Sequence, residues 1–122
     1  MTDDPSPFEI HLSTPYRRGA CPAGATHTGG AHSKICGDFV RFEFAVADGT
    51  VLQAWHTSSG CLVCQTGASL LSEFAEGRTL EELKAHSPQD HLNLFGMQLT
   101  PLRQRCALVS YTALRDAFDF DL

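Results

Sequence analysis

Apolar and polar residues alternate with a period of two through residues 40–46 of the chain, where valine or phenylalanine occupies every even position. This pattern is typical of a strand that buries one face. Asp48 and Gly49 follow, and both residue types tolerate the positive φ angles of a two-residue hairpin loop. Residues 50–57 then provide the returning strand. The sequence therefore predicts an antiparallel β-hairpin.

Helical spacing of apolar residues marks most of the remaining chain. A short helix is predicted over residues 8–12, and a longer one opens at Cys61 and ends near Gly77, because glycine suits the end of a helix. Three later segments carry an N-cap residue followed by an acid or a proline, which is the signature of a helix start. They are Thr79-Leu80-Glu81-Glu82, Ser87-Pro88-Gln89-Asp90 and Thr100-Pro101.

These elements predict one α+β domain over residues 1–122, in which helices pack on one face of a small antiparallel sheet with the hairpin at its centre. Residues 1–7 are expected to be frayed. Residues 19–34 are rich in Gly, Ala, His and Thr without an apolar period, and they are interpreted as a mobile loop.

The composition indicates which partners the protein binds and in which compartment it works. The net charge is -5 and the nine basic residues are scattered, which argues against binding to nucleic acid. No apolar run is long enough for a membrane span, and the acidic amino terminus does not resemble a signal peptide. The odd number of cysteines, five, fits poorly with a secreted disulfide framework. We therefore expect a cytoplasmic protein with reduced thiols.

Three cysteines stand at the boundaries of predicted elements: Cys36 before the first strand, and Cys61 and Cys106 near the starts of two helices. Asp38 is two residues from Cys36. Three thiolates and a carboxylate make a four-ligand set for zinc or iron, and a helix amino terminus favours the thiolate form. The alternative interpretation is that these cysteines are small residues of the core.

Other residues offer further chemistry. Cys61 and Cys64 have the C-x-x-C spacing of redox dithiols, although a hairpin precedes them instead of a βαβ unit. Dithiol oxidoreductase therefore stands as an alternative function. Among the histidines, His32 and His56 lie near enough in sequence to the cysteines to be reserve ligands, and the others are expected to be solvated.

Taken together, these stretches resemble the scaffold proteins of iron–sulfur cluster assembly, the IscU, SufU and NifU amino-terminal family. The resemblance runs from about His11 to Leu114. It rests on three motifs in the family's order, each with the matching element beside it. They are Ile35-Cys36-Gly37-Asp38 before the alternating strand, Gly60-Cys61 before a helix of small residues that ends in Gly77-Arg78-Thr79-Leu80-Glu81-Glu82, and Arg105-Cys106-Ala107-Leu108 in the last helix.

The resemblance implies that Cys36, Asp38, Cys61 and Cys106 hold a [2Fe–2S] cluster or Zn²⁺. It also implies that a cysteine desulfurase delivers sulfur, with Cys106 or Cys61 as the acceptor, and that the cluster passes to apo iron–sulfur proteins. Such a protein is a carrier and no enzyme. Asp38 would keep the cluster labile, and Cys64 is at most an accessory ligand.

Two departures from the family keep a second function open. Arg105 stands where the IscU branch has histidine, as in the SufU branch, yet the 45-residue step from Cys61 to Cys106 leaves little room for the SufU insertion. A zinc-bound, SufU-like sulfurtransferase partner of a desulfurase is therefore the alternative. Thr100 replaces a proline of the IscU chaperone-recognition loop, so the resemblance does not imply a chaperone.

Overall fold

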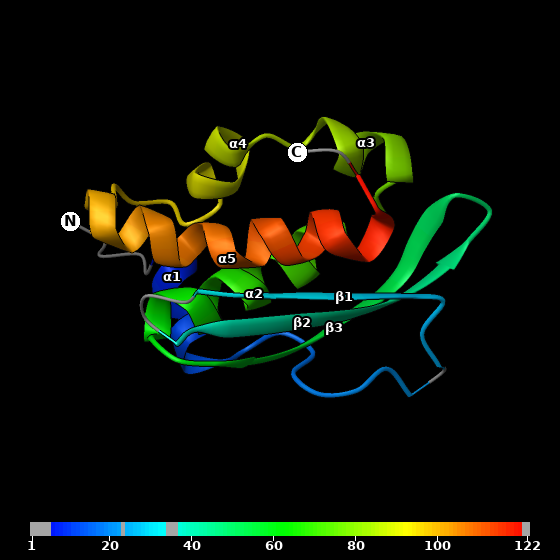
Figure 1. The fold of residues 1–122 in the computed structure, drawn as a ribbon, viewed down its shortest axis with the longest axis horizontal. Coiled ribbons are helices and arrows are strands. Elements are labelled where there is room, and N and C mark those ends of the chain that lie inside the picture. Colours follow the sequence, from blue (N-terminus) through cyan, green and yellow to red (C-terminus); the bar gives the residue numbers. More distant parts are fainter. Residues whose placement is uncertain (1–5, 23, 34–36, 121–122) are drawn as a thin grey trace.

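The computed structural model describes residues 6–22, 24–33 and 37–120, in which three strands and five helices follow one another along the chain (Figure 1). Cys36 lies outside the described residues, so its predicted place in the site is not described here. In chain order the elements are α1 (Pro7–Ser13), β1 (His27–His32), β2 (Phe39–Ala47), β3 (Thr50–Ser59), α2 (Leu62–Ala75), α3 (Leu80–Ala85), α4 (Pro88–Asn93) and α5 (Pro101–Phe118).

The strands form an antiparallel sheet in the order β1-β2-β3, and the predicted hairpin is its β2–β3 pair. Asp48 and Gly49 have φ angles of 52° and 74°, as the two-residue loop requires. The register shifts between Ala45 and Val46 because Leu52 is the extra residue of a bulge. The buried face of β3 changes parity at this point, and Leu52 is left 59% exposed.

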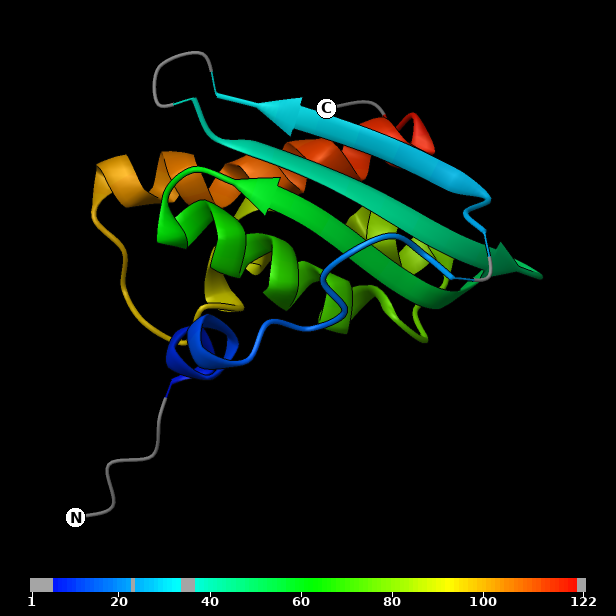
Figure 2. The ribbon, with the colours of Figure 1, turned by 90° about the horizontal axis from the view of Figure 1, so that it is seen from below.

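The helices α2 and α5 pack side by side on one face of the sheet, which confirms the predicted α+β class (Figure 2). The core contains the three inward residues of β2, which are Val40, Phe42 and Phe44, together with Leu71 of α2 and Leu114 of α5. Each of these side chains is fully buried. The sequence of β2 alternates because only one of its faces packs against this layer of helices.

The predicted loop over residues 19–34 was wrong for residues 27–32, which form the edge strand β1. This strand lacks an apolar period because α5 crosses it at very short range. A methyl group built on Gly29 would lie 2.2 Å from the Ala117 backbone nitrogen. The amide of Gly30 also donates a hydrogen bond to Asp116 of α5, at 3.0 Å. Glycine is thus required here by close packing and does not indicate a loop.

The predicted frayed end does not reach Pro7. Ser6 caps α1 by accepting a hydrogen bond from the Glu9 amide at 3.2 Å, and Pro7 occupies the first helical position. The capping boxes predicted at Thr79 and Ser87 are both present. No helix within the described part of the chain is long and apolar enough to cross a membrane.

Candidate metal centre

Asp38, Cys61 and Cys106 come together at one end of the molecule, although 68 positions separate the first from the last. One ligand atom from each lies within 4.8 Å of the others. Asp38 immediately precedes β2, Cys61 caps α2, and Cys106 lies in the second turn of α5. Both views show the start of β2 and the amino-terminal ends of α2 and α5 at this end (Figures 1 and 2).

The carboxylate of Asp38 is held in place by the backbone of Cys61. The Cys61 amide donates to Asp38 Oδ1 at 2.9 Å, and the Cys61 thiol donates to Oδ2 at 3.4 Å. Asp38 is only 1% exposed, so these contacts fix its position beside the sulfur.

Gly60 makes this close approach possible. A methyl group on Gly60 would lie 2.2 Å from Asp38 Oδ1, and its φ of +111° is one that side chains with a Cβ rarely adopt. The glycine before the second predicted cysteine is therefore part of the site, because it leaves room for the carboxylate.

The amino terminus of α2 points at the Cys61 sulfur. Cys61 is the N-cap of this helix, and its Sγ accepts a hydrogen bond from the Cys64 amide at 3.4 Å. An unpaired amide and the positive end of the helix dipole favour negative charge on an N-cap group. The predicted placement of this thiol at a helix start is therefore confirmed.

Cys106 has a different electrostatic environment. Burial raises the pKa of its thiol above the ordinary value, and the hydrogen bond with Cys61 and the nearby Asp38 carboxylate raise it further. We expected the helix start to lower the pKa of this thiol. That expectation was wrong in the absence of a metal, because Cys106 lies in the second turn and is 8% exposed. A bound cation has the opposite effect, since a coordinating thiol is deprotonated.

The donor set and spacing fit a small soft or borderline cation. Zinc bonds of about 2.3 Å to sulfur in tetrahedral geometry place two sulfurs about 3.8 Å apart. The separations of up to 4.8 Å among the three described donors are thus within reach of small side-chain rotations. Cys36 precedes Asp38 by two residues in the sequence, and it is the predicted fourth donor.

An apolar groove with a volume of about 650 Å³ opens onto these three residues. Its walls come from α1, α2 and α5, and include two leucines that are largely exposed: Leu62 at 58% and Leu102 at 62%. The motifs of the sequence did not predict this apolar wall. The sequence did carry one indication of this wall, because a leucine, Leu62, directly follows Cys61. In the structure Leu62 is the first residue of α2 and turns away from the core.

The remaining candidates lie outside this group. Cys64 is fully buried behind Cys61, and its sulfur lies 3.9 Å from the Phe39 carbonyl oxygen. The reserve ligands do not join the group of described donors either. His56 is buried and lines a separate small pocket with Ser58 and His11, and His32 is exposed at the end of β1.

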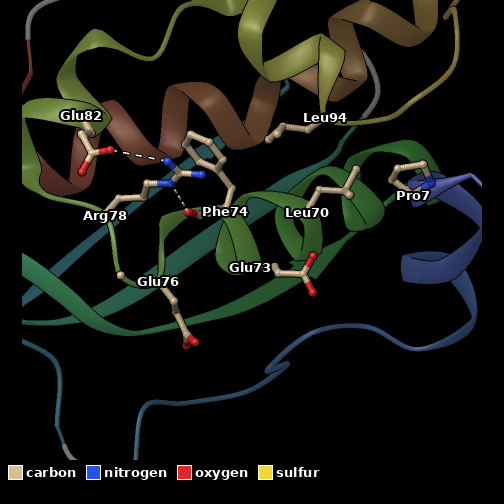
Figure 3. Close-up of a pocket in the computed structure, with 9 residues that line it drawn as sticks. Pro7, Leu70, Glu73, Phe74, Glu76, Arg78, Glu82 and Leu94 are labelled. Carbon is tan, nitrogen blue, oxygen red and sulfur yellow. Dashed lines mark hydrogen bonds and ion pairs between the residues drawn. The ribbon is translucent and has the colours of Figure 1, made fainter.

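A second pocket, of about 530 Å³, lies along the other end of α2 (Figure 3). The Arg78 guanidinium lies 4.4 Å from the centre of the Phe74 ring and forms an ion pair with Glu82 at 3.5 Å. Leu70 and Leu94 line the same pocket. It holds neither a thiol nor any of the predicted ligands, so we do not assign the metal chemistry to it.

The comparisons with known proteins agree with this geometry. The model of the NifU-like N terminal domain matches residues 10–120, so the chain belongs to that family and the resemblance to the iron–sulfur scaffold family is confirmed. The bifunctional protein NifU/MnmA of Rubrobacter xylanophilus is 33% identical over 110 residues. This match covers 89% of the chain but only 22% of that longer relative.

Solved structures share the fold at low sequence identity. The amino-terminal NifU-like protein of Brucella abortus superposes with a TM-score of 0.71 at 20% identity, covering 93% of this chain and 90% of that one. A protein of Fervidobacterium islandicum AW-1, proposed to be an iron–sulfur cluster assembly scaffold for the SUF system, gives a TM-score of 0.70 at 15% identity. That match covers 92% of this chain and 93% of the other.

Proposed function

We propose that this protein is a scaffold on which an iron–sulfur cluster, [2Fe–2S] in type, is assembled and then passed to apo-proteins. Membership of the NifU-like family supports this function. The observation that carries it is the meeting of Asp38, Cys61 and Cys106 beside an open apolar groove. With Cys36 as the fourth donor, the protein supplies three thiols and a carboxylate. It acts as a carrier and has no turnover chemistry of its own.

The Asp38 carboxylate allows the site to release its cluster. Carboxylate oxygen is a harder and weaker ligand for iron than thiolate, so Asp38 is the first ligand to leave. The Cys61 amide that donates to Oδ1 remains available to hold the carboxylate after it has left. Asp38 therefore exchanges between a metal ion and a fixed hydrogen-bond donor, which keeps the cluster transferable.

Cys61 is the better placed thiol to take up sulfur from a cysteine desulfurase. It is half-buried on the wall of the groove, whereas Cys106 is 8% exposed. Two exposed leucines, Leu62 and Leu102, flank the approach to Cys61 and Cys106. They offer an apolar surface to a partner that has to insert a cysteine-bearing segment.

A zinc-bound sulfur acceptor is the second candidate function. The three described donors suit zinc as well as iron, and Arg105 precedes Cys106 as in the SufU branch that the motifs resemble. In that function a ligand thiol leaves the zinc to accept persulfide sulfur, and no cluster accumulates on the chain. The two functions therefore differ in what the loaded protein carries.

Anaerobic reconstitution separates the two. The protein is incubated with iron, cysteine and a cysteine desulfurase, its absorption spectrum is recorded, and cluster transfer to apo-ferredoxin is followed. We expect cluster absorption and transfer from the wild type and neither from Cys61→Ser. Cys21→Ser is the matched control, because Cys21 is a buried thiol that donates a hydrogen bond to Gln53 and does not belong to the donor group. Persulfide uptake on a zinc-loaded chain without cluster absorption would favour the second candidate.

Asp38→Ala tests the role of the carboxylate. Removal of the weakest ligand is expected to slow transfer to apo-ferredoxin several-fold, because the remaining thiolates release the cluster less readily. Asp38→Asn is the matched variant, since its side-chain oxygen still accepts from the Cys61 amide. Transfer kinetics and thermal unfolding are measured together. Faster transfer, or loss of folding in both variants, would contradict the proposed role.

A further inference from the structure

We propose that Cys64 is an internal reductant that releases sulfide from sulfur bound to Cys61. When Cys61 carries a persulfide, the Cys64 sulfur attacks the inner sulfur atom, a Cys61–Cys64 disulfide forms, and the outer sulfur leaves as hydrogen sulfide. This inference rests on the proposed function, because it requires Cys61 to receive sulfur. It assigns to Cys64 a role that neither the ligand set nor the family relationship provides.

The two cysteines have the spacing that a disulfide needs. Cys61 is the N-cap of α2 and Cys64 is the third residue of that helix, so they stand one turn apart. Residues at this separation have Cα atoms about 5–6 Å apart, which is within the range of disulfides. The Cys64 amide already donates to Cys61 Sγ at 3.4 Å. The sulfur of Cys61 thus lies against the residue that would attack it.

Both sulfurs also lie against the same short stretch of the chain, residues 38 and 39. Cys61 Sγ lies 3.4 Å from a carboxylate oxygen of Asp38, and Cys64 Sγ lies 3.9 Å from the carbonyl oxygen of the next residue, Phe39. The side chains therefore leave the helix in a common direction, towards the start of β2. A disulfide between them requires rotation about side-chain bonds and no unfolding of the first turn.

Their difference in exposure gives each thiol a distinct role. Cys61 lines the groove, so a sulfur donor from outside reaches it directly. Cys64 is fully buried, so the same donor does not reach it. In a persulfide on Cys61, the outer sulfur extends into the groove and the inner sulfur stays beside Cys64. Attack from inside the protein therefore falls on the inner sulfur, as sulfide release requires.

The step is balanced without an external electron donor. The S–S bond of the persulfide breaks, and the S–S bond between Cys61 and Cys64 forms. The two cysteines are oxidised by two electrons, and the outer sulfur is reduced to sulfide. The proton of the Cys64 thiol leaves with it as part of hydrogen sulfide. A dithiol reductant then restores the pair for another round. Sulfide is thus produced beside Asp38 and Cys106, where a cluster would need it.

The test uses purified protein with a chelator present, so that no metal holds Cys61. Two sulfur sources are compared in the absence of reductant: a cysteine desulfurase with cysteine, and inorganic polysulfide. The hydrogen sulfide released is quantified in the desulfurase reaction, because polysulfide itself yields sulfide when it reacts with a thiol. For both sources the cysteine state is mapped by mass spectrometry of protease fragments. Cys64→Ala removes the attacking sulfur, and Cys21→Ala is the control because it also removes one buried thiol.

From the wild type and Cys21→Ala we expect one hydrogen sulfide per chain and a disulfide that links Cys61 with Cys64. Cys64→Ala should retain the extra sulfur atom on Cys61 and release sulfide only when dithiothreitol is added. A stable persulfide on wild-type Cys61, or equal sulfide release from Cys64→Ala, would overturn the proposal. The fragment map of the wild type decides the matter even if Cys64→Ala does not fold.

The two sulfur sources separate this proposal from the proposed function. If the desulfurase loads no variant while polysulfide still produces the Cys61–Cys64 disulfide, the sulfur-release step stands and delivery by a desulfurase fails. If the desulfurase loads Cys61 in every variant and no disulfide follows, delivery stands and the role of Cys64 fails.

Discussion

At the scale of single residues, the candidate site depends on the absence of a side chain as much as on its ligands. Gly60 leaves the space that the Asp38 carboxylate fills, and the Cys61 amide fixes that carboxylate beside the sulfur. Two neighbouring residues thus have three roles: Gly60 leaves the space, the Cys61 amide is the hydrogen-bond donor, and the Cys61 sulfur is the candidate ligand.

Replacement of Gly60 by alanine should weaken metal binding. The added methyl group would collide with Asp38 Oδ1 and impose strain at φ +111°. Because the carboxylate would shift, we expect zinc affinity to fall by about 10–100-fold, the usual cost of disturbing a group that orients a ligand. Competition with a chromophoric chelator measures this affinity.

Gly49→Ala is the control for Gly60→Ala. Gly49 also has a positive φ, of +74°, but no atom lies within 4 Å of an added methyl group there. It should lose stability from backbone strain while its zinc affinity stays at the wild-type value. Equal affinity in both variants would show that Gly60 does not position the carboxylate.

At the scale of elements, the two ends of α5 have different roles. Its first half carries Cys106 to the site, and its last turns lie directly on β1. Thr100 begins the helix by accepting a hydrogen bond from the Arg103 amide at 3.3 Å, and Asp116 near the end accepts from the Gly30 amide. The helix therefore joins the edge of the sheet to the candidate metal centre.

Gly29→Ala tests the contact between α5 and β1. The methyl group would overlap the Ala117 backbone, so overpacking should lower the free energy of unfolding by about 1–3 kcal/mol. In Gly30→Ala the nearest atom is the Val40 carbonyl oxygen at 3.1 Å, and the loss should be smaller. Urea unfolding of the two variants provides the comparison. A larger loss in Gly30→Ala would contradict the described packing of β1.

At the scale of the whole molecule, several histidines are part of the core. His91 is fully buried, and its Nε2 donates to the Ala107 carbonyl oxygen at 2.8 Å. Burial lowers the pKa of His91 to about 3, and it lowers the pKa of His56 to about 4. A proton on the second ring nitrogen of His91 would find no acceptor among the described residues. Both rings are therefore kept neutral by the fold.

The free energy of unfolding should consequently fall in mild acid. A histidine of pKa about 6.5 in the unfolded chain binds a proton more readily than these buried rings do. The contribution of the two neutral rings to the free energy of unfolding is therefore fully present above pH 6.5, and it is lost as the pH falls towards 4. Between pH 8 and pH 5 the expected loss is about 2 kcal/mol for each ring. Urea unfolding at the two pH values measures it.

His91→Phe separates this effect from the titration of other groups. The variant keeps an aromatic ring in the core but has no proton to bind, so its pH dependence should be smaller by the contribution of one ring. His32→Gln, at an exposed position, should keep the pH dependence of the wild type. An unchanged slope in His91→Phe would show that this ring does not control acid stability.

The sequence by itself determined the elements whose patterns are local. The period of two in β2, the Asp48-Gly49 loop and the capping residues of α3, α4 and α5 depend on neighbours a few residues away, and they appear in the structure as predicted. The position of Cys61 at a helix start was likewise visible, because helix starts are marked by the residues around them.

Only the tertiary structure decided what depends on distant partners. β1 carries no strand pattern of its own, since α5 takes the place of side chains at Gly29. The raised pKa of Cys106 comes from burial by other elements. The meeting of Asp38, Cys61 and Cys106, and the burial of Cys64 behind Cys61, follow from how β2, α2 and α5 pack at one end of the sheet. Spacing along a chain does not specify such contacts, because packing of the whole core brings these positions together.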